Sequence, residues 1–279
     1  MEGTIGQQNN AVFNVSDSQI DNTVRFYPTV WREELTLIKL RDRAATVYLD
    51  GNKLTANSGD IIIARPFALH SVCPESDGDA PTLTVVTINL RALSTANVGA
   101  RNFGALIPFF HEKNVPYRIT SADDGYLELN DRLSALSRVT DDEAIQETVY
   151  ALLKALYERR LPPQKHNMSA EKQHFAARKT IAYISCNYAQ PITIEMLTEI
   201  SGYSEFYLMK LFKQYTGISC IDYVNGYRIK EASRLLTETK TDANEIARAV
   251  GYANISYFNR QFKRLTGVTP LVLRLTSRK

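Results

Sequence analysis

Residues 197–217 read LTEISGYSEFYLMKLFKQYTG, and residues 246–267 read IARAVGYANISYFNRQFKRLTG. The second stretch repeats the first, with an offset of 49 residues between Gly202 and Gly251. In each copy a helix with apolar periodicity ends at this glycine, which can take the left-handed conformation of a tight turn. A polar residue shortly after the glycine can cap the helix that follows. Each copy therefore has the sequence pattern of a helix-turn-helix unit.

The residues between the two copies predict one long helix from Ile221 to Leu236, because their apolar side chains recur at helical spacing. A helix of about 16 to 18 residues is about 25 Å long. With the flanking helices it can hold the second helices of the two units about one turn of DNA apart, roughly 34 Å. The sequence therefore predicts that one chain places two recognition helices in successive major grooves of a duplex.

The 279-residue chain has a net charge of +3 that is unevenly distributed. Residues 175–279 carry 15 Lys and Arg against 8 Asp and Glu, a net charge of +7, whereas residues 1–174 carry 18 against 22, a net charge of −4. An acidic half followed by a basic half is typical of a sensor joined to a domain that binds a polyanion. The N-terminus lacks the apolar run of a signal peptide, and no apolar run approaches the roughly 20 residues that cross a bilayer. We therefore expect a soluble, cytoplasmic protein without a membrane segment.

The N-terminal half predicts strands between about residues 24 and 90, because short runs rich in β-branched residues alternate with turn signals such as Asp50-Gly51-Asn52. Several short strands divided by turns indicate a sandwich or a barrel. After about residue 123 the apolar spacing becomes helical, and the prolines after Leu161 end that pattern. The candidate strands are Leu35–Leu40, Thr46–Leu49, Ile61–Ala64 and Leu83–Ile88, and the apolar helical positions are Leu127, Leu129, Leu133, Leu136, Ile145, Val149, Leu152, Leu153 and Leu156.

Cys73, Cys186 and Cys220 are an odd, scattered set without the C-x-x-C spacing of metal sites. We interpret them as small buried hydrophobic residues and not as disulfides or zinc ligands. The sequence predicts no metal and no cofactor.

The segment from about 175 to 276 resembles the DNA-binding domain of the AraC/XylS family of transcriptional regulators. Thr198 and Cys220 depart from the family pattern, which usually has Ala and Pro there. The matching residues are Gly202-Tyr203-Ser204, Leu208, Phe212-Lys213, Thr216-Gly217, Tyr227-Arg228, Ala232, Leu235-Leu236, Ile246-Ala247, Val250-Gly251-Tyr252, Tyr257-Phe258, Phe262-Lys263, Gly267 and Thr269-Pro270.

The resemblance implies that exposed positions early in each recognition helix contact base edges. Among them Arg260 is the strongest candidate, because a guanidinium can bond bidentately to guanine. Phosphate contacts position a protein on DNA without specifying sequence. The alternatives are core packing for Phe206 and Met209, and an ordinary solvated surface for Asn259 and the phosphate candidates. The base-contact candidates are Phe206, Met209, Lys210, Ile255, Ser256, Asn259 and Arg260, and the phosphate candidates are Lys213, Lys263 and Arg264.

The stretch from Trp31 to Val72 resembles the cupin-like sensor domain of this family. Metal-dependent cupins usually carry two histidines in the early strand, and those positions are Val30 and Arg32 here. The resemblance therefore implies a sensor and not a metal enzyme. The candidate effector pocket is Trp31, Tyr48, Arg65 and His70, with a hydrogen-bonded histidine inside the barrel as the alternative for His70.

These observations predict an α+β protein with an N-terminal cupin-like β-barrel (jelly roll) and dimerisation helices at residues 1–161. A linker at 162–174 and an all-α domain at 175–279 follow, with helix-turn-helix units at about 194–215 and 243–266 joined by a long helix. We expect a DNA-binding regulator, an activator that responds to a small molecule such as a sugar and has double-stranded DNA, RNA polymerase and a second copy of itself as partners. The helices near 124–160 can alternatively serve only to cover the barrel. A DNA-repair methyltransferase with a fused domain of this type, or a cupin enzyme, are the alternatives; the first needs a reactive, metal-bound cysteine cluster and the second needs metal ligands.

Overall fold

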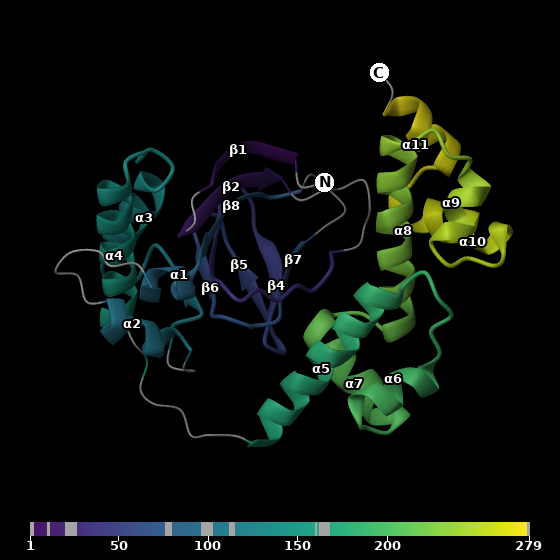
Figure 1. Ribbon diagram of the computed structural model, residues 1–279, viewed down its shortest axis with the longest axis horizontal. Helices are drawn as coiled ribbons and strands as arrows, with labels where there is room; N and C mark the ends of the chain where they lie inside the picture. Colours follow the sequence, from purple (N-terminus) through teal and green to yellow (C-terminus); the bar gives the residue numbers. More distant parts are fainter. Residues whose placement is uncertain are drawn as a thin grey trace.

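The computed structural model describes residues 3–9, 12–19, 27–75, 80–95, 103–111, 115–159, 161 and 168–277. An N-terminal region of β-sheets and helices is followed by a wholly helical C-terminal region (Figure 1). The mixed α+β class predicted from the sequence is confirmed. Most of the expected linker lies outside the described residues, and its last part, residues 168–174, forms the start of a helix.

The described strands form two separate antiparallel sheets. The order in the larger sheet is β1-β2-β8-β3-β6-β9, and the order in the smaller sheet is β5-β4-β7. Buried residues of the two sheets share one core cluster, so the sheets pack face to face as a sandwich. No ladder between described strands joins them, so a closed barrel is not shown. The strands are β1 (Gly3–Asn9), β2 (Phe13–Gln19), β3 (Leu35–Leu40), β4 (Ala45–Leu49), β5 (Asn52–Ala56), β6 (Ile61–Ala64), β7 (His70–Pro74), β8 (Thr82–Ile88) and β9 (Arg118–Ile119).

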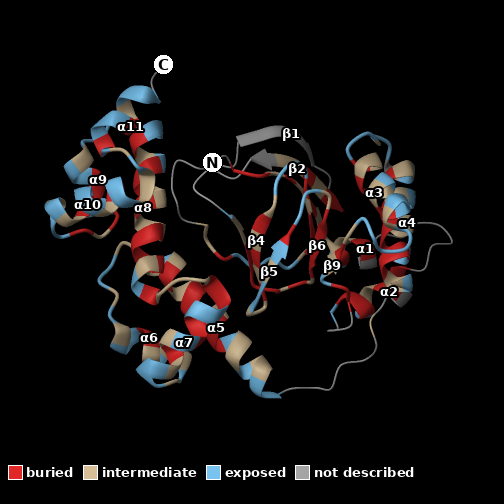
Figure 2. Ribbon diagram, turned by 180° about the vertical axis from the view of Figure 1, so that it is seen from behind, coloured by how far each residue is buried: buried red, intermediate tan, exposed pale blue. Residues whose placement is uncertain are grey.

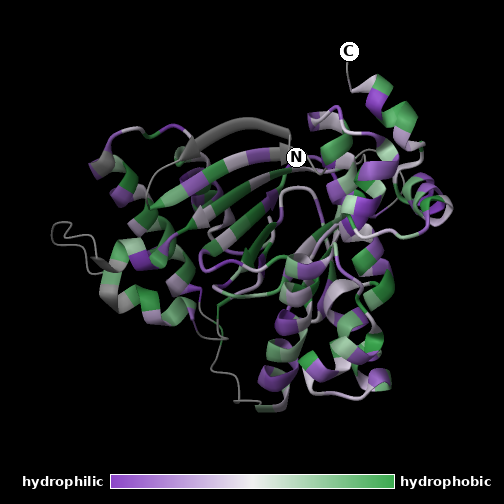
Figure 3. Cartoon of the chain, turned by 45° about the vertical axis from the view of Figure 1, so that its right-hand side comes forward, coloured by the Kyte–Doolittle hydropathy of each residue, from purple (hydrophilic) through white to green (hydrophobic). Residues whose placement is uncertain are grey.

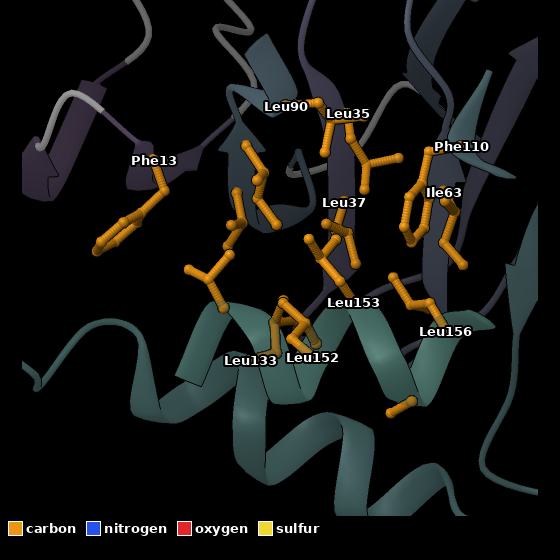
Figure 4. Packing of buried hydrophobic residues seen from close by; sticks show 14 of the residues in the cluster. Phe13, Leu35, Leu37, Ile63, Leu90, Phe110, Leu133, Leu152, Leu153 and Leu156 are labelled. Carbon is orange, nitrogen blue, oxygen red and sulfur yellow. The ribbon is translucent and has the colours of Figure 1, made fainter. Parts of the chain in front are cut away.

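The strands β3 and β6 of the larger sheet are buried on both faces, and their successive side chains point to opposite sides. Leu35 and Leu37 of β3 pack toward the helices, whereas Ile38 and Leu40 pack against the smaller sheet. Figure 4 shows leucines of the covering helices, including Leu153, against the first of these faces. The covering helices are α1 (Leu90–Thr95), α2 (Phe103–Phe110), α3 (Tyr126–Ala135) and α4 (Asp142–Glu158).

The C-terminal region is built around one long helix, α8, with a helical pair toward each of its ends (Figure 1). Its helices are amphipathic, with mixed hydrophobic and hydrophilic residues along each of them (Figure 3), and their buried faces share one core. The helices are α5 (Met168–Asn187), α6 (Ile194–Ser201), α7 (Glu205–Thr216), α8 (Cys220–Glu238), α9 (Ala243–Ala249), α10 (Ile255–Thr266) and α11 (Pro270–Thr276).

The two regions are in direct contact. Leu69, which precedes β7, is fully buried and belongs to the core of the C-terminal region. Tyr223 of α8 is 1 % exposed, and its hydroxyl donates a hydrogen bond to the carbonyl oxygen of Thr29 at 3.1 Å. Figure 2 shows the buried segments of α5 and α8 on the side of the sandwich. The sheet region therefore completes part of the helical core.

Candidate nucleic-acid interface

Both helical pairs turn at a glycine with positive φ. Gly202 follows α6 with φ +72°, and Gly251 follows α9 with φ +93°. An L side chain rarely adopts this conformation, which explains why the repeat carries glycine at both positions. Each turn is followed directly by a 12-residue helix, α7 or α10. The two helical pairs are thus built alike, as the repeat predicts.

The two recognition helices begin differently and end alike. Asn254 caps α10, since its side-chain oxygen accepts a hydrogen bond from the backbone N–H of Tyr257 at 2.9 Å. Ser204 occupies the same position before α7, but its hydroxyl makes no capping hydrogen bond. Both helices end at a left-handed glycine, Gly217 with φ +82° and Gly267 with φ +77°.

The outer faces of α7 and α10 carry most of the predicted base contacts. Phe206, at the start of α7, is 82 % exposed. Such exposure of a large apolar side chain is typical of a surface that binds a partner. Lys210, one turn further along α7, is also exposed. Met209 and Ile255 are half-buried and pack against the helical core, which matches the packing alternative for Met209. On α10 the exposed candidates are Ser256, Asn259 and Arg260.

The predicted phosphate contacts fall into two groups. Lys213 and Lys263 are exposed near the ends of α7 and α10. Arg264 instead lies 3.1 Å from Asp222 of α8 in a solvent-exposed ion pair. A phosphate would therefore have to compete with that carboxylate for the Arg264 guanidinium.

The predicted effector residues Tyr48 and Arg65 lie at the boundary with the C-terminal region. The ring of Tyr48 approaches Gly217 so closely that a Cβ on this glycine would lie 2.6 Å from it. Arg65 pairs with Asp50 at 2.9 Å. Next to Asp50, Gly51 has φ +82°, and a Cβ there would lie 3.2 Å from the ring of Tyr215 on α7. The β4–β5 turn therefore docks on the C-terminal end of the first recognition helix.

Asp50 is the polar centre of this contact. Its carboxylate accepts a hydrogen bond from the backbone N–H of Leu69 at 2.9 Å. His174 of α5 places Nε2 2.9 Å from Asp50, an ion-pair distance without the alignment of a hydrogen bond. Burial opposes ionisation of Asp50, but His174, the charge of Arg65 and the Leu69 N–H outweigh it and hold the pKa of Asp50 below its ordinary value.

The other two predicted effector residues have partners of their own. The guanidinium carbon of Arg178 on α5 lies 4.5 Å from the centroid of the Trp31 ring and 5.0 Å from that of Phe67. His70 is 4 % exposed, and its Nδ1 lies 3.0 Å from the carbonyl oxygen of Ala68. Burial lowers the pKa of His70 below its ordinary value. Its surroundings match the alternative of a hydrogen-bonded structural histidine.

Sequence reasoning missed the C-terminal half of this contact. His174 and Arg178 fell within or beside the expected linker, and Asp50 was interpreted only as part of a hairpin turn. An aspartate and a glycine are common turn residues, so their pattern gives no sign that the turn also touches another region.

Cys220 is buried and Cys73 is half-buried, whereas Cys186 is exposed, so the prediction of a buried cysteine is wrong for Cys186. Burial raises the pKa of Cys73 to about 11 and that of Cys220 to about 12, so neither is a reactive thiolate near neutral pH. In the described ranges, no three His, Cys, Asp or Glu side chains gather as metal ligands would. Over the same ranges, no helix combines the length and apolarity that a bilayer crossing demands.

Comparison with known proteins gives the same assignment of the C-terminal region. Residues 197–276 match a family model described as a helix-turn-helix domain. The HTH-type transcriptional regulator YobQ of Bacillus subtilis is 35 % identical over 106 residues, which are 38 % of this chain and 44 % of YobQ. The chain therefore spans less than half of that relative's length. YdiP of Escherichia coli, also an HTH-type regulator, is 25 % identical over 244 residues, covering 85 % of this chain and 77 % of YdiP.

A solved structure of a probable AraC family transcriptional regulator from Rhodopseudomonas palustris is 30 % identical; the match covers 38 % of this chain and 99 % of that one, with a TM-score of 0.35. The two helical pairs and the family model define a C-terminal region of the helix-turn-helix class, which the curated HTH-type regulators share. The C-terminal region contains an AraC-type helix-turn-helix domain.

Proposed function

We propose that this protein is a DNA-binding transcriptional regulator that inserts α7 and α10 into adjacent major grooves of one operator, with α8 between them. The observation that carries the proposal is the matched exposure of Phe206 and Lys210 on α7 and of Ser256, Asn259 and Arg260 on α10. At 19 residues, α8 is roughly 28 Å long, which together with the flanking helices suits one turn of DNA.

The test starts from duplexes that the full chain selects from a random library. Chemical footprinting should then give two protected major-groove segments about one helical turn, roughly 10 base pairs, apart. Affinity should fall steeply with salt, because each neutralised phosphate releases a counterion. A single protected segment would contradict insertion of both helices.

We propose that the N-terminal sandwich is a cupin-like sensor for a small-molecule effector such as a sugar. The side chains of Trp31, Tyr48 and Arg65 suit such a ligand, because aromatic rings stack on sugar faces and a guanidinium binds hydroxyls or carboxylates. All three side chains lie at the boundary between the sheet region and the helical region. An effector bound there would therefore change how the two regions dock on each other. A thermal-shift screen of small metabolites on the full chain tests this, since a ligand that binds only the folded state raises its stability.

We further propose that the protein is a cytoplasmic activator, since its partner is DNA, and that it works as a homodimer with RNA polymerase. The outer surface of α3 supports a dimer contact there, because Leu127 is 73 % exposed while the opposite side of the helix covers the sheet. Light scattering of wild-type and Leu127→Glu protein tests the dimer. Run-off transcription from a promoter carrying the selected operator distinguishes an activator from a repressor.

A further inference from the structure

We propose that Asn225 and Arg228 of α8 are positioning residues that fix the spacing and rotational phase of the two recognition helices. The chain would then bind strongly only to operators whose two half-sites are separated by one particular distance. The inference rests on the proposed insertion of α7 and α10 into the same duplex.

Asn225 fixes the position of the second unit along α8. It is 5 % exposed, and its Nδ2 donates a hydrogen bond to the hydroxyl of Tyr257 on α10 at 3.2 Å. Its Oδ1 accepts a hydrogen bond from the hydroxyl of Tyr252, in the turn before α10, at 3.0 Å. A buried amide that loses its partners is costly, so this register of α10 on α8 is strongly preferred.

Arg228 ties the same place to the segment that leads from α5 into the first unit. Its Nε donates a hydrogen bond to the carbonyl oxygen of Tyr188 at 2.7 Å, and its Nη2 donates one to the carbonyl oxygen of Gln190 at 2.8 Å. Both carbonyls belong to the segment that follows α5. The guanidinium carbon also lies 5.4 Å from the centroid of the Tyr252 ring. A planar fork with two bonds fixes direction as well as distance, so Arg228 joins the end of α5 to the turn of the second unit.

The backbone of the second unit also meets this connecting segment at the junction. A Cβ on Gly251 would lie 2.8 Å from the carbonyl oxygen of Ala189 and 2.9 Å from that of Tyr188. Gly202, the equivalent glycine of the first unit, has nothing within 4 Å of such a Cβ. Gly251 therefore needs to lack a side chain both because of its positive φ and because it contacts the segment between α5 and α6.

This junction limits motions that a single connecting helix would leave open. A helix alone sets the distance between its ends, but the pairs attached to it can still bend and twist. Each added base pair moves the second half-site by about 3.4 Å and rotates it by about 35°. A rigid junction cannot follow that change without losing contacts in one groove, whereas a loosened junction can.

The experiment measures affinity of the full chain for its selected operator and for versions with one or two base pairs inserted or deleted between the half-sites. For wild-type protein we expect affinity to fall at least about tenfold for a one-base-pair change, because bivalent binding is lost when geometry forbids simultaneous engagement. In Arg228→Ala and Asn225→Ala this penalty should shrink to about twofold to threefold, with affinity for an isolated half-site unchanged.

Two milder variants keep the test valid if an alanine variant does not fold. Arg228→Lys keeps the charge but not the fork, and Tyr257→Phe removes only the hydroxyl that meets Asn225. Gly251→Ala should also weaken the spacing penalty, whereas Gly202→Ala should leave it intact, although both carry a similar backbone cost.

An unchanged spacing penalty in the folded variants would overturn the inference. That outcome differs from failure of the proposed function, in which wild-type protein would select no duplex or would protect only one groove.

Discussion

Arg260 is an exposed guanidinium on the outer face of α10, with its carbon 5.8 Å from the centroid of the Tyr257 ring. We expect Arg260→Ala to weaken operator binding by about 1–3 kcal/mol and to relax sequence preference at one base pair, since bidentate bonds to guanine carry that discrimination. Fluorescence anisotropy with the selected operator and its single-base variants measures both effects. Arg234→Ala is the control, because Arg234 lies on α8 in ion pairs with Glu231 and Glu238. Unchanged affinity of Arg260→Ala would remove Arg260 from the interface.

Asp50 links protonation to docking of the two regions. Because its pKa lies below the ordinary value of 3.8, the ionised carboxylate stabilises the folded chain above that pH. This stabilisation is lost as the pH falls through the lowered pKa. We expect Asp50→Asn to lower the melting temperature near neutral pH and to flatten its fall in acid, as thermal unfolding across pH 3 to 7 would show. A variant curve that runs parallel to that of wild type would contradict this role.

Single residues were the hardest level to infer from sequence. The repeat locates α7 and α10, and the family resemblance implies which of their positions are candidates for base contact, among them Phe206 and Arg260. It could not show that Met209 and Ile255 lean into the core, or that Arg264 already has a carboxylate beside it. These outcomes depend on where neighbouring helices lie, which the periodicity of one helix does not contain.

At the scale of elements, α7 and α10 allow a comparison between two equivalent N-cap positions, of which only Asn254 makes a capping hydrogen bond. Asn254→Ala should destabilise the chain by about 1 kcal/mol, because an N–H at the start of α10 loses its side-chain acceptor. Ser204→Ala should change stability by less than about 0.5 kcal/mol, since the Ser204 hydroxyl does not cap α7. Urea unfolding of both variants gives the comparison, and equal losses would show that the difference in capping has no energetic weight.

Elements with a strong pattern were predicted closely, and polar ones were missed. The runs Leu35–Leu40 and Ile61–Ala64 are β3 and β6 with the same bounds, because they are rich in β-branched and aliphatic residues. The strands β1, β5 and β7 are polar or mixed in sequence and are stabilised by pairing with neighbouring strands. The local sequence does not indicate this pairing. In α3, Leu127 belongs to the helical pattern and yet is exposed, so apolar spacing alone did not identify the buried face.

For the whole molecule, Trp31 is a built-in reporter, because it is the only tryptophan of the chain and it lies at the boundary beside Arg178. Gly217→Ala should loosen this boundary, since its Cβ would meet the Tyr48 ring at 2.6 Å, and the emission of Trp31 should shift to longer wavelength. Gly267→Ala is the matched control: it carries the same backbone cost of roughly 1–2 kcal/mol but has nothing within 4 Å. Equal emission spectra for the two variants would contradict docking of the β4–β5 turn on α7.

The relation between the two regions could not be predicted from the sequence. Composition and charge separate an acidic half from a basic half, but they carry no information about a contact between the two. The contact between them brings together residues as distant as Thr29 and Tyr223, which are 194 positions apart. Such pairings follow from three-dimensional packing of complementary surfaces, and neither surface has a pattern of its own.

Leu69 has a practical consequence for anyone who shortens this chain. A fragment that starts at α5 would keep every described helix of the C-terminal region but lose Leu69, which the sheet region inserts among them. Removal of Leu69 would expose the apolar side chains that surround it to water. Such a fragment should therefore self-associate or bind hydrophobic dyes more readily than the intact protein. We therefore expect that the isolated C-terminal region will be easier to purify when one of these newly exposed apolar residues is replaced by a polar one.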